Sequence, residues 1–399
     1  MDITITPGKL SGSIRAVASK SQAHRLLICA AFADKETILI CRETSQDIEA
    51  TVDCLCSLGA RILRTKIGYR VLPVSNIPEQ ATLHCRESGS TLRFLLPVVG
   101  ALGVDATFIM DGRLPYRPLF PLWEEMERHG CALTQPTETT LHCNGRLLPG
   151  DYSIDGSISS QFISGLLFAL ALIPGRTSLN VTGTLESKPY VDMTRNALQQ
   201  FGINTDNDSI TTSLPFTSPG QITVEGDWSN SAFFLAANAL GSDITIFNLN
   251  PDSAQGDRVI TEILTELENG EAVINAADIP DLIPILSIIA GAKHGALFTN
   301  IRRLRQKESD RVASICEMLA RLGARTESTE NSLQVFPAKY HGCTIPSFGD
   351  HRIAMAAAIA ATVATNAVTI SDAQCVSKSY PTFWDDFRQL GGQYEQHIR

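Results

Sequence analysis

Five cationic side chains lie within ten residues of one another in the segment 302–311, which reads Arg-Arg-Leu-Arg-Gln-Lys-Glu-Ser-Asp-Arg. The protein as a whole is acidic, with a formal net charge of −9. Apolar residues then recur every three to four positions from Val312 to Leu322, and this pattern predicts a helix that ends at Gly323. Cations are unfavourable at a helix N-terminus because the macrodipole is positive there. A bound anion would relieve the repulsion, whereas a solvated basic surface is the alternative interpretation.

Two acidic residues have surroundings that could alter their proton affinity. Asp281 is a lone acid within the apolar stretch 279–286, and Glu308 lies between Lys307 and Arg311. Carboxylates in unlike environments can divide the duties of general base and general acid. The alternative for Asp281 is a plain N-cap of the helix that follows it.

Five further segments join a polar or basic group of residues to a nearly all-apolar helix pattern. They begin near Ser19, Ser88, Ser159, Asp227 and Asp350. A helix that is apolar on all faces is buried, although its N-terminus can open onto a cleft. Each Ser or Asp could simply cap its helix. Because several of these starts also carry Lys or Arg, we expect a shared site for a phosphorylated ligand.

Two isolated cations are further candidates. Arg117 lies between Pro115 and Pro118, which limit its backbone freedom and could preset its guanidinium for a carboxylate or phosphate. Lys378 precedes a helix pattern that starts near Phe383, and an ordinary surface lysine is the alternative.

One pattern repeats along the chain: an amphipathic helix ends in Gly, and a short apolar strand follows. The glycines are Gly59, Gly130, Gly202, Gly323 and Gly391, with a weaker copy at Gly270. Glycine suits a helix end because the left-handed conformation there is costly for other residues. The roughly 50–70-residue spacing predicts six copies of a unit with two helices and several strands.

Composition and missing motifs narrow the class of protein. The 399 residues, 44% hydrophobic and 19% charged, are typical of a globular protein with two domains. The acidic balance argues against a nucleic-acid partner, and no apolar run is long enough to predict a membrane span. Neither a P-loop nor a Gly-x-Gly-x-x-Gly motif is present. Ten scattered cysteines without a CxxC pair predict reduced core thiols, no zinc site and a cytoplasmic location, and no signal peptide is expected.

Seven motifs in order together resemble the 5-enolpyruvylshikimate-3-phosphate synthase family of enolpyruvyl transferases. They are Ser19-Lys20-Ser21 with Arg25, Ser88-Gly89-Ser90 with Arg93, Arg117-Pro118, the segment from Asp155 to Gln161, Ser187-Lys188-Pro189-Tyr190, the segment from Lys307 to Arg311, and Asp350-His351-Arg352. The resemblance implies an α/β fold with two similar domains, each built from three βαβαββ repeats as an inside-out α/β barrel. The active site would lie in the interdomain cleft. One domain would span 20–225, and residues 1–19 and 226–399 would form the other.

The resemblance also implies roles for individual residues. Asp281 would take the proton from the 5-hydroxyl of shikimate 3-phosphate, Glu308 would protonate the methylene carbon of phosphoenolpyruvate, and Lys20 would touch both substrates. Shikimate 3-phosphate would be bound by Lys20, Ser21, Arg25, Ser159, Ser160, Gln161, Ser187, Tyr190, Asp281 and Lys307. Phosphoenolpyruvate would be bound by Lys20, Gly89, Arg117, Gln161, Arg311, Arg352 and Lys378. No metal or organic cofactor is implied, and a monomer is expected.

The two substrates would carry roughly five negative charges together, and seven of these residues are cationic. The family pattern is altered at Ser90, where many members have Thr, and at Arg303, which we leave unassigned. Gly89 is kept, which predicts inhibition by glyphosate. The rival within the fold is an enolpyruvyl transferase for UDP-N-acetylglucosamine, which typically has a Cys in the loop matching 111–117, where this chain has none. The rival from another class is a non-catalytic anion-binding protein, which would be expected to lose Asp281 or Glu308.

Overall fold

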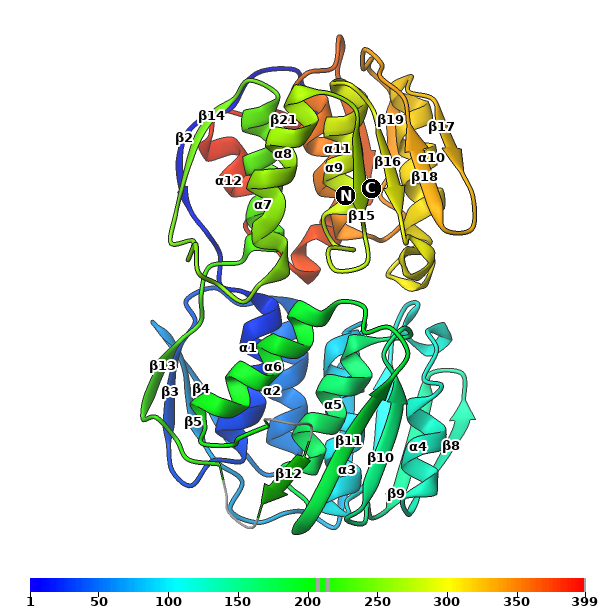
Figure 1. Ribbon diagram of the computed structural model, residues 1–399. Coiled ribbons are helices and arrows are strands. Elements are labelled where there is room, and N and C mark those ends of the chain that lie inside the picture. Colours follow the sequence, from blue (N-terminus) through cyan, green and yellow to red (C-terminus); the bar gives the residue numbers. More distant parts are fainter. Residues whose placement is uncertain (206–208, 213–215, 398–399) are drawn as a thin grey trace. The chain divides into compact units, whose positions relative to one another are not determined.

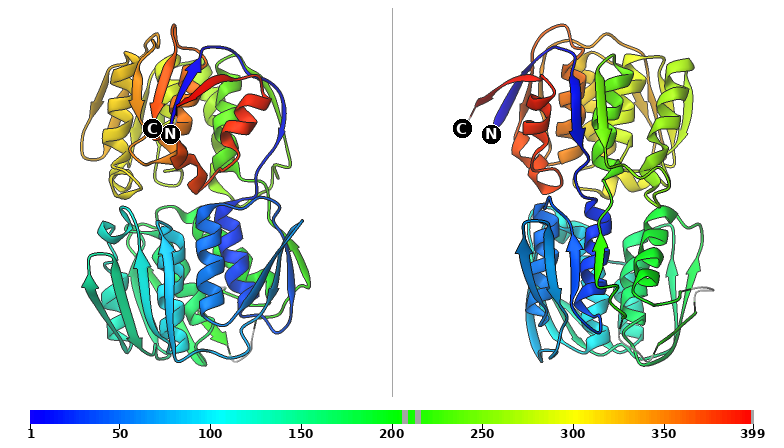
Figure 2. Two further views of the ribbon diagram at one scale, coloured as in Figure 1. Left: turned by 180° about the vertical axis from the view of Figure 1, so that it is seen from behind. Right: turned by 90° about the vertical axis from the view of Figure 1, so that its left-hand side faces the viewer.

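The computed structural model describes residues 1–205, 209–212 and 216–397. The chain divides into two compact units. The continuous unit is Ala18–Glu225, and the discontinuous unit combines Met1–Val17 with Gly226–Arg399. Within each unit the long helices lie at the centre and the sheets lie around them (Figures 1 and 2). This arrangement follows from the apolar helices, which can only be stable where all their faces are covered.

The continuous unit holds three copies of one motif. The complete copy has a four-stranded sheet of order β6-β7-β9-β8 and consists of β6 (Gln80–Arg86), α3 (Gly89–Leu102), β7 (Asp105–Met110), α4 (Leu122–Arg128), β8 (Cys131–Thr137) and β9 (Thr140–Gly145). The next copy consists of β10 (Asp151–Asp155), α5 (Ser160–Leu170), β11 (Gly175–Thr182), α6 (Lys188–Gln200) and β12 (Ser209–Thr212). The third comprises α1 (Lys20–Ala31), β3 (Thr37–Ile40), α2 (Gln46–Ser57), β4 (Arg61–Thr65) and β5 (Gly68–Leu72), completed by β13 (Gln221–Thr223).

The discontinuous unit repeats the plan. Its complete copy is β15 (Ala272–Asn275), α9 (Ile283–Ala292), β16 (Ala296–Thr299), α10 (Arg311–Leu322), β17 (Thr326–Ser328) and β18 (Ser332–Val335). A second copy is β19 (Thr344–Pro346), α11 (His351–Ala361), β20 (Val368–Ser371), α12 (Phe383–Gln389) and β21 (Gln393–His397), completed by β1 (Asp2–Thr6). The third is β2 (Ser11–Arg15), α7 (Trp228–Ala239), β14 (Asp243–Phe247) and α8 (Ile260–Asn269). The predicted α/β class and the six copies are confirmed.

The repeated glycines mark the second helix of each copy. Five of them have positive φ, as at Gly323 with 95°, which ends α10 in the left-handed region. The prediction was wrong at Gly270: its φ of 165° is extended backbone, so α8 ends without a left-handed cap.

The polar segments mark the first helix of each copy. Ser19, Ser88, Ser159, Asp227 and Asp350 each accept a backbone N–H of the helix that follows, so the capping interpretation is correct for these five side chains. The sixth first helix is α9, which Asp281 precedes. Its N-cap position is Leu282 and has no side-chain cap bond, so the capping alternative for Asp281 is wrong.

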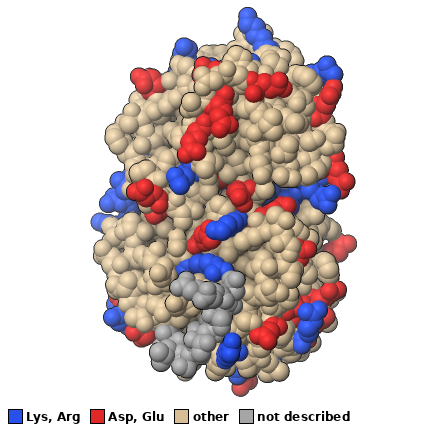
Figure 3. Space-filling model, viewed as in Figure 1, with Lys and Arg blue, Asp and Glu red and all other residues tan. Residues whose placement is uncertain are grey.

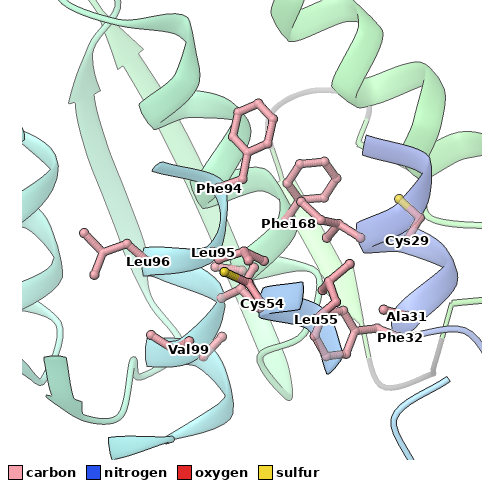
Figure 4. Close-up of a cluster of buried hydrophobic side chains, with 14 of the residues drawn as sticks. Cys29, Ala31, Phe32, Cys54, Leu55, Phe94, Leu95, Leu96, Val99 and Phe168 are labelled. Carbon is pink, nitrogen blue, oxygen red and sulfur yellow. The ribbon is translucent and has the colours of Figure 1, made fainter. Parts of the chain in front are cut away.

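Each unit has its own hydrophobic core. In the continuous unit the core joins Cys29 of α1, Leu55 of α2, Phe94 of α3 and Phe168 of α5 (Figure 4). The ten cysteines are free, and six of them are buried. Burial raises the pKa of the Cys29 thiol, which makes it unreactive.

One face of the molecule is of mixed charge. On the face that Figure 3 shows, Lys and Arg are interspersed with Asp and Glu among large areas of other residues. No helix in the described part of the chain has the length and apolar character needed to cross a membrane.

Candidate functional site

The predicted residues other than Lys378 fall into two clusters, one in each unit. The first, here called the α1–α6 cluster, lies in the continuous unit and draws on α1, α3, α5, α6 and the segment around Arg117. The second, here called the Arg311 cluster, lies in the discontinuous unit and comprises Asp281, Lys307, Glu308, Arg311, Asp350 and Arg352. Each cluster is described separately below.

In the α1–α6 cluster, Lys20 is the first residue of α1. Its Nζ lies 3.0 Å from Oδ2 of Asp47 on α2, and both side chains are largely buried. Asp47 was not predicted, because it is 27 residues away and only the fold brings the pair together. The carboxylate holds the ammonium in place at the first turn of α1.

Arg25 is buried, and its guanidinium forms hydrogen bonds with residues of α1 and α6. Its Nε donates to Oγ1 of Thr194 at 2.8 Å, and Nη2 donates to the carbonyl of Tyr190 at 2.8 Å. Nη1 donates to the carbonyl of Ser21 at 2.6 Å. Burial lowers the pKa of this guanidinium to about 10, so it stays charged at neutral pH. Arg25 therefore ties α1 to α6, a structural role that the motif did not predict.

A second arginine, Arg93, organises the start of α3. Its Nη1 donates to Oε1 of Gln161 at 3.3 Å, and its Nη2 donates to the carbonyl of Pro118 at 3.1 Å. Gln161 in turn donates from Nε2 to Oγ of Ser90 at 3.0 Å. Arg93 thus joins α3, α5 and the Arg117 segment, and its place in the motif was its only signal in the sequence.

Gly89 leaves space for two guanidinium groups. A Cβ added at this residue would lie 2.7 Å from Nη1 of Arg117 and 2.7 Å from Nη1 of Arg93. Its φ is not in the left-handed region, so the constraint is one of space and not of backbone conformation. The structure therefore brings Gly89 and Arg117 together, as the anion-site hypothesis requires.

The predicted serines lie at the starts of two neighbouring helices, α5 and α6. Ser159 accepts the backbone N–H of Gln161, and Ser160 is buried as the first residue of α5. Ser187 precedes α6 in a left-handed conformation, with φ 55°. Such strain in a residue with a side chain is kept where function or packing demands it. Tyr190 lies in the first turn of α6 and contributes its carbonyl to Arg25.

In the Arg311 cluster, one buried guanidinium contacts three carboxylates. The side chain of Arg311 is 1% exposed. Its Nε lies 2.9 Å from Asp350, Nη1 lies 2.7 Å from Asp281, and Nη2 lies 2.8 Å from Glu308. The protein's own carboxylates thus relieve the repulsion within the basic segment, and the expected bound anion stays a prediction. Arg302 and Arg305 likewise pair with Glu330 and Asp310.

Asp281 is held by three cations. Besides Arg311, Nη2 of Arg352 lies 3.1 Å from its Oδ2, and Nζ of Lys307 lies 3.7 Å from its Oδ1. Burial alone would raise the pKa of Asp281, but Arg352, Lys307 and Arg311 hold it well below the ordinary value. Burial lowers the pKa of Lys307 to about 8, although Asp281 opposes that shift. Asp281 is therefore ionised at neutral pH.

Residues that were not predicted as ligands support this cluster. Asp350 is fully buried, caps α11 through Oδ1 and accepts Nε of Arg311 through Oδ2. Arg352 donates from Nη1 to the carbonyl of Ser229 at 3.2 Å, and the hydroxyl of Ser229 donates to Asp257. Burial, together with Asp281, raises the pKa of Asp257 to about 7. Apart from the cap of α11, these contacts join residues 28 to 123 positions apart, so no local pattern indicated them.

Lys378 ends the 3-10 helix η5 (Ala373–Lys378) and is 8% exposed, which excludes the surface-lysine alternative. The next residue, Ser379, is held by Nδ2 of Asn230, which lies 3.3 Å from Ser379 Oγ. Within the described residues, no group of three or more His, Cys, Asp or Glu is arranged to hold a metal ion. The α1–α6 cluster offers fixed cations and hydroxyls, and the Arg311 cluster offers fixed cations; these are the groups that bind phosphate and carboxylate.

Comparisons with known proteins agree on one family. Residues 5–387 match the family model of EPSP synthase (3-phosphoshikimate 1-carboxyvinyltransferase). A 3-phosphoshikimate 1-carboxyvinyltransferase of Clostridium kluyveri is 39% identical, over 99% of this chain and 98% of its own. One of Clostridium beijerinckii is 36% identical, also over 99% and 98%.

Solved structures agree on the fold. That of EPSP synthase from Acinetobacter baumannii has a TM-score of 0.80 and 23% identity, over 99% of this chain and 100% of that one. The enolpyruvyl transferase NikO from Streptomyces tendae has a TM-score of 0.76 and 17% identity, over 100% and 99%. At these identities the two structures show that the fold is shared.

Proposed function

The chain belongs to the EPSP synthase family, and from this membership we propose that its two clusters act together on one pair of substrates. The enzyme transfers the enolpyruvyl group of phosphoenolpyruvate to shikimate 3-phosphate. The ion pairs around Asp281 carry the proposal, because they place a partly buried carboxylate among the cations that two anionic substrates require. The relatives' names do not favour UDP-N-acetylglucosamine as acceptor.

The division of labour follows the chemistry of each cluster. The serine-rich helix starts of the α1–α6 cluster suit the 3-phosphate of shikimate 3-phosphate, with Ser159, Ser160 and Ser187 as its ligands. Arg117, Arg311, Arg352 and Lys378 suit the phosphate and carboxylate of phosphoenolpyruvate. Lys20 contacts both substrates.

Arg311 links substrate binding to proton transfer. Without ligand it is paired with both Asp281 and Glu308. When phosphoenolpyruvate engages Arg311 and Arg352, those carboxylates lose positive charge from their surroundings and bind protons more readily. Asp281 becomes a stronger base towards the 5-hydroxyl, and Glu308 can carry the proton that it delivers. The substrate itself thereby makes the base and the acid competent.

The proton balance closes over the two steps. In the first, Asp281 takes the 5-hydroxyl proton, the oxygen attacks C2 of phosphoenolpyruvate, and Glu308 protonates C3, which gives a tetrahedral ketal. In the second, Glu308 recovers a proton from the methyl group, the C–O bond to phosphate breaks, and phosphate leaves with the proton held by Asp281. Both carboxyl groups return to their starting states.

The function is tested by phosphate release from phosphoenolpyruvate. We expect release with shikimate 3-phosphate and none with UDP-N-acetylglucosamine. The reverse pattern would assign the chain to the other enolpyruvyl transferases, and no release with either acceptor would favour a non-catalytic binding protein.

The activity should fall at high pH as Lys307 loses its proton. With a pKa of about 8, Lys307 is charged below pH 8 and loses its proton above it. Above pH 8, kcat/KM for shikimate 3-phosphate should therefore drop about tenfold per pH unit. The profile is measured from pH 7 to 10. Lys307→Arg should shift the fall in kcat/KM to higher pH. A wild-type profile that stays flat to pH 10 would contradict a role for the charged form of Lys307.

Gly89→Ala should weaken the binding of phosphoenolpyruvate without unfolding the enzyme. The new Cβ would meet the guanidinium nitrogens of Arg117 and Arg93, and both groups would have to move. We expect KM for phosphoenolpyruvate to rise about tenfold with kcat nearly kept, since binding geometry is disturbed more than chemistry. We also propose that glyphosate inhibits the wild type at low phosphoenolpyruvate and inhibits this variant at least about tenfold less.

Gly8→Ala is the matched control, because a Cβ at Gly8 would have nothing within 4 Å. It should leave both kinetic constants and glyphosate inhibition unchanged. Equal KM values in the two variants would show that Gly89 does not lie beside bound phosphoenolpyruvate.

A further inference from the structure

A buried chain of hydrogen bonds crosses three helices of the continuous unit. Nδ1 of His24 on α1 lies 2.7 Å from Oγ1 of Thr51 on α2, and that oxygen lies 2.7 Å from Oγ1 of Thr91 on α3. Thr91 donates from Oγ1 to Oγ of Ser88 at 2.7 Å. All four side chains have no exposed surface. We call this set the His24 chain.

The chain has a definite direction. A threonine hydroxyl has one proton to donate. Thr91 donates its proton to Ser88, so Thr51 must donate to Thr91. Thr51 then accepts from His24, and Nδ1 is therefore the protonated nitrogen of the imidazole.

The other imidazole nitrogen fits a neutral ring. Among the residues that the structure describes, Nε2 of His24 has no hydrogen-bond partner, and the ring packs edge-on against Phe94. Burial, followed by the charges of Lys20 and Arg25, lowers the pKa of His24. The imidazole is thus fixed as a neutral donor and is not placed to exchange protons with a substrate.

The chain lies one turn inside the residues assigned to the site. On α1, His24 follows Lys20 by four positions, and on α2, Thr51 follows Asp47, the partner of Lys20, by four. On α3, the chain ends at Ser88, the N-cap that also accepts the backbone N–H of Thr91. Gly89 and Ser90 follow Ser88 directly. The first turns of α1, α2 and α3 carry site residues or their partners. One set of buried hydrogen bonds therefore joins these three helices next to those turns.

We propose that His24 is a positioning residue that acts through Thr51 and Thr91 to hold Ser88, and hence Gly89 and Ser90, in place for phosphoenolpyruvate. The inference rests on the proposed function, because it takes the start of α3 as part of the phosphoenolpyruvate site. The ligands of shikimate 3-phosphate on α5 and α6 lie outside the chain. Breaking the chain should therefore affect the two substrates unequally.

The decisive variant is Thr51→Val, which removes the central hydroxyl and keeps the side-chain shape. We expect KM for phosphoenolpyruvate to rise about tenfold, the effect of one broken buried hydrogen bond. The Kd of shikimate 3-phosphate, measured by titration calorimetry, should stay within about threefold. Its ligands on α5 and α6 are not moved, and on α1 Lys20 keeps its contact with Asp47 and Arg25 keeps its bonds to α6. Hydrogen exchange should quicken at the amides of residues 89–92 and remain unchanged in α10.

Conservative replacements provide the rescue. Thr51→Ser keeps the hydroxyl and should behave as the wild type. His24→Asn can place an amide N–H where Nδ1–H lies and should restore most of the phosphoenolpyruvate affinity that His24→Leu loses. Thermal unfolding of each variant shows that the compared proteins are folded.

Wild-type turnover is measured first, and its absence would defeat the proposed function and not this inference alone. With turnover present, an unchanged KM for phosphoenolpyruvate in folded Thr51→Val and His24→Leu would overturn the inference. Equal weakening of both substrates would also overturn it, because that result indicates a general loss of stability. If His24→Leu fails to fold, Thr51→Val alone decides.

Discussion

Replacing Asp281 by Asn is expected to lower kcat by about a thousandfold or more, the range observed when a general base is removed. The amide keeps the shape of the side chain but cannot accept the proton of the 5-hydroxyl. Binding of shikimate 3-phosphate should stay within about tenfold, because most of its proposed ligands are on the continuous unit. Turnover is measured as phosphate release and binding by titration calorimetry.

Asp278→Asn serves as the control for this variant. Asp278 is exposed, lies three residues before Asp281 and belongs to neither cluster. It should retain wild-type turnover. An Asp281→Asn enzyme that turned over within a few-fold of the wild type would remove Asp281 from the mechanism and leave it as a structural partner of the cations.

Replacing Arg311 by Leu should damage both stability and activity. Three carboxylates would lose a buried partner, and breaking a buried ion pair by removing one member costs about 3–5 kcal/mol of unfolding free energy. KM for phosphoenolpyruvate should also rise by about a hundredfold or more, because a charged ligand is lost. Denaturant unfolding and steady-state kinetics measure the two effects.

The same helix supplies the control. Arg321 on α10 pairs with Glu317 at 2.7 Å, but both side chains are more than 40% exposed. Arg321→Leu should change the free energy of unfolding by less than about 1 kcal/mol, since exposed pairs contribute little. If the two variants had the same free energy of unfolding, the three ion pairs of Arg311 would contribute no more to stability than an exposed pair does.

The repeated architecture could be predicted from local patterns. A glycine after an amphipathic helix and a polar cap before an apolar one are signals within a few residues, and they located eleven of the twelve α-helices in the part of the chain that the structure describes. The remaining helix, α9, lacks the polar cap of the second pattern, because Asp281, the acid before it, does not cap it. Asp281 departs from the rule of the other five copies because its oxygens are engaged by Arg311 and Arg352. The exception in the repeat thus coincides with the proposed base.

The partners of the cations could not be predicted. Asp350 and Arg311 are 39 residues apart, and Asp281 and Arg352 are 71 apart, so only the packing of α9, α10 and α11 brings them together. Three of the carboxylates that pair with the basic segment could not be predicted for the same reason, since Asp281, Glu330 and Asp350 come from other parts of the chain. Arg25 has a second role that no local pattern indicated. Its motif indicated a ligand, but the structure adds a buried cross-link between α1 and α6.

The central claim is that both clusters serve one pair of substrates. A crystal structure of the enzyme with shikimate 3-phosphate and glyphosate tests it most directly. The 3-phosphate should lie against Ser159, Ser160 and Ser187, and glyphosate against Arg311 and Arg352. The 5-hydroxyl should lie within hydrogen-bond distance of Asp281. The account would be contradicted if the serines bound the ligands while Asp281 and Arg311 stayed remote from them and kept only the ion pairs that they form without ligand.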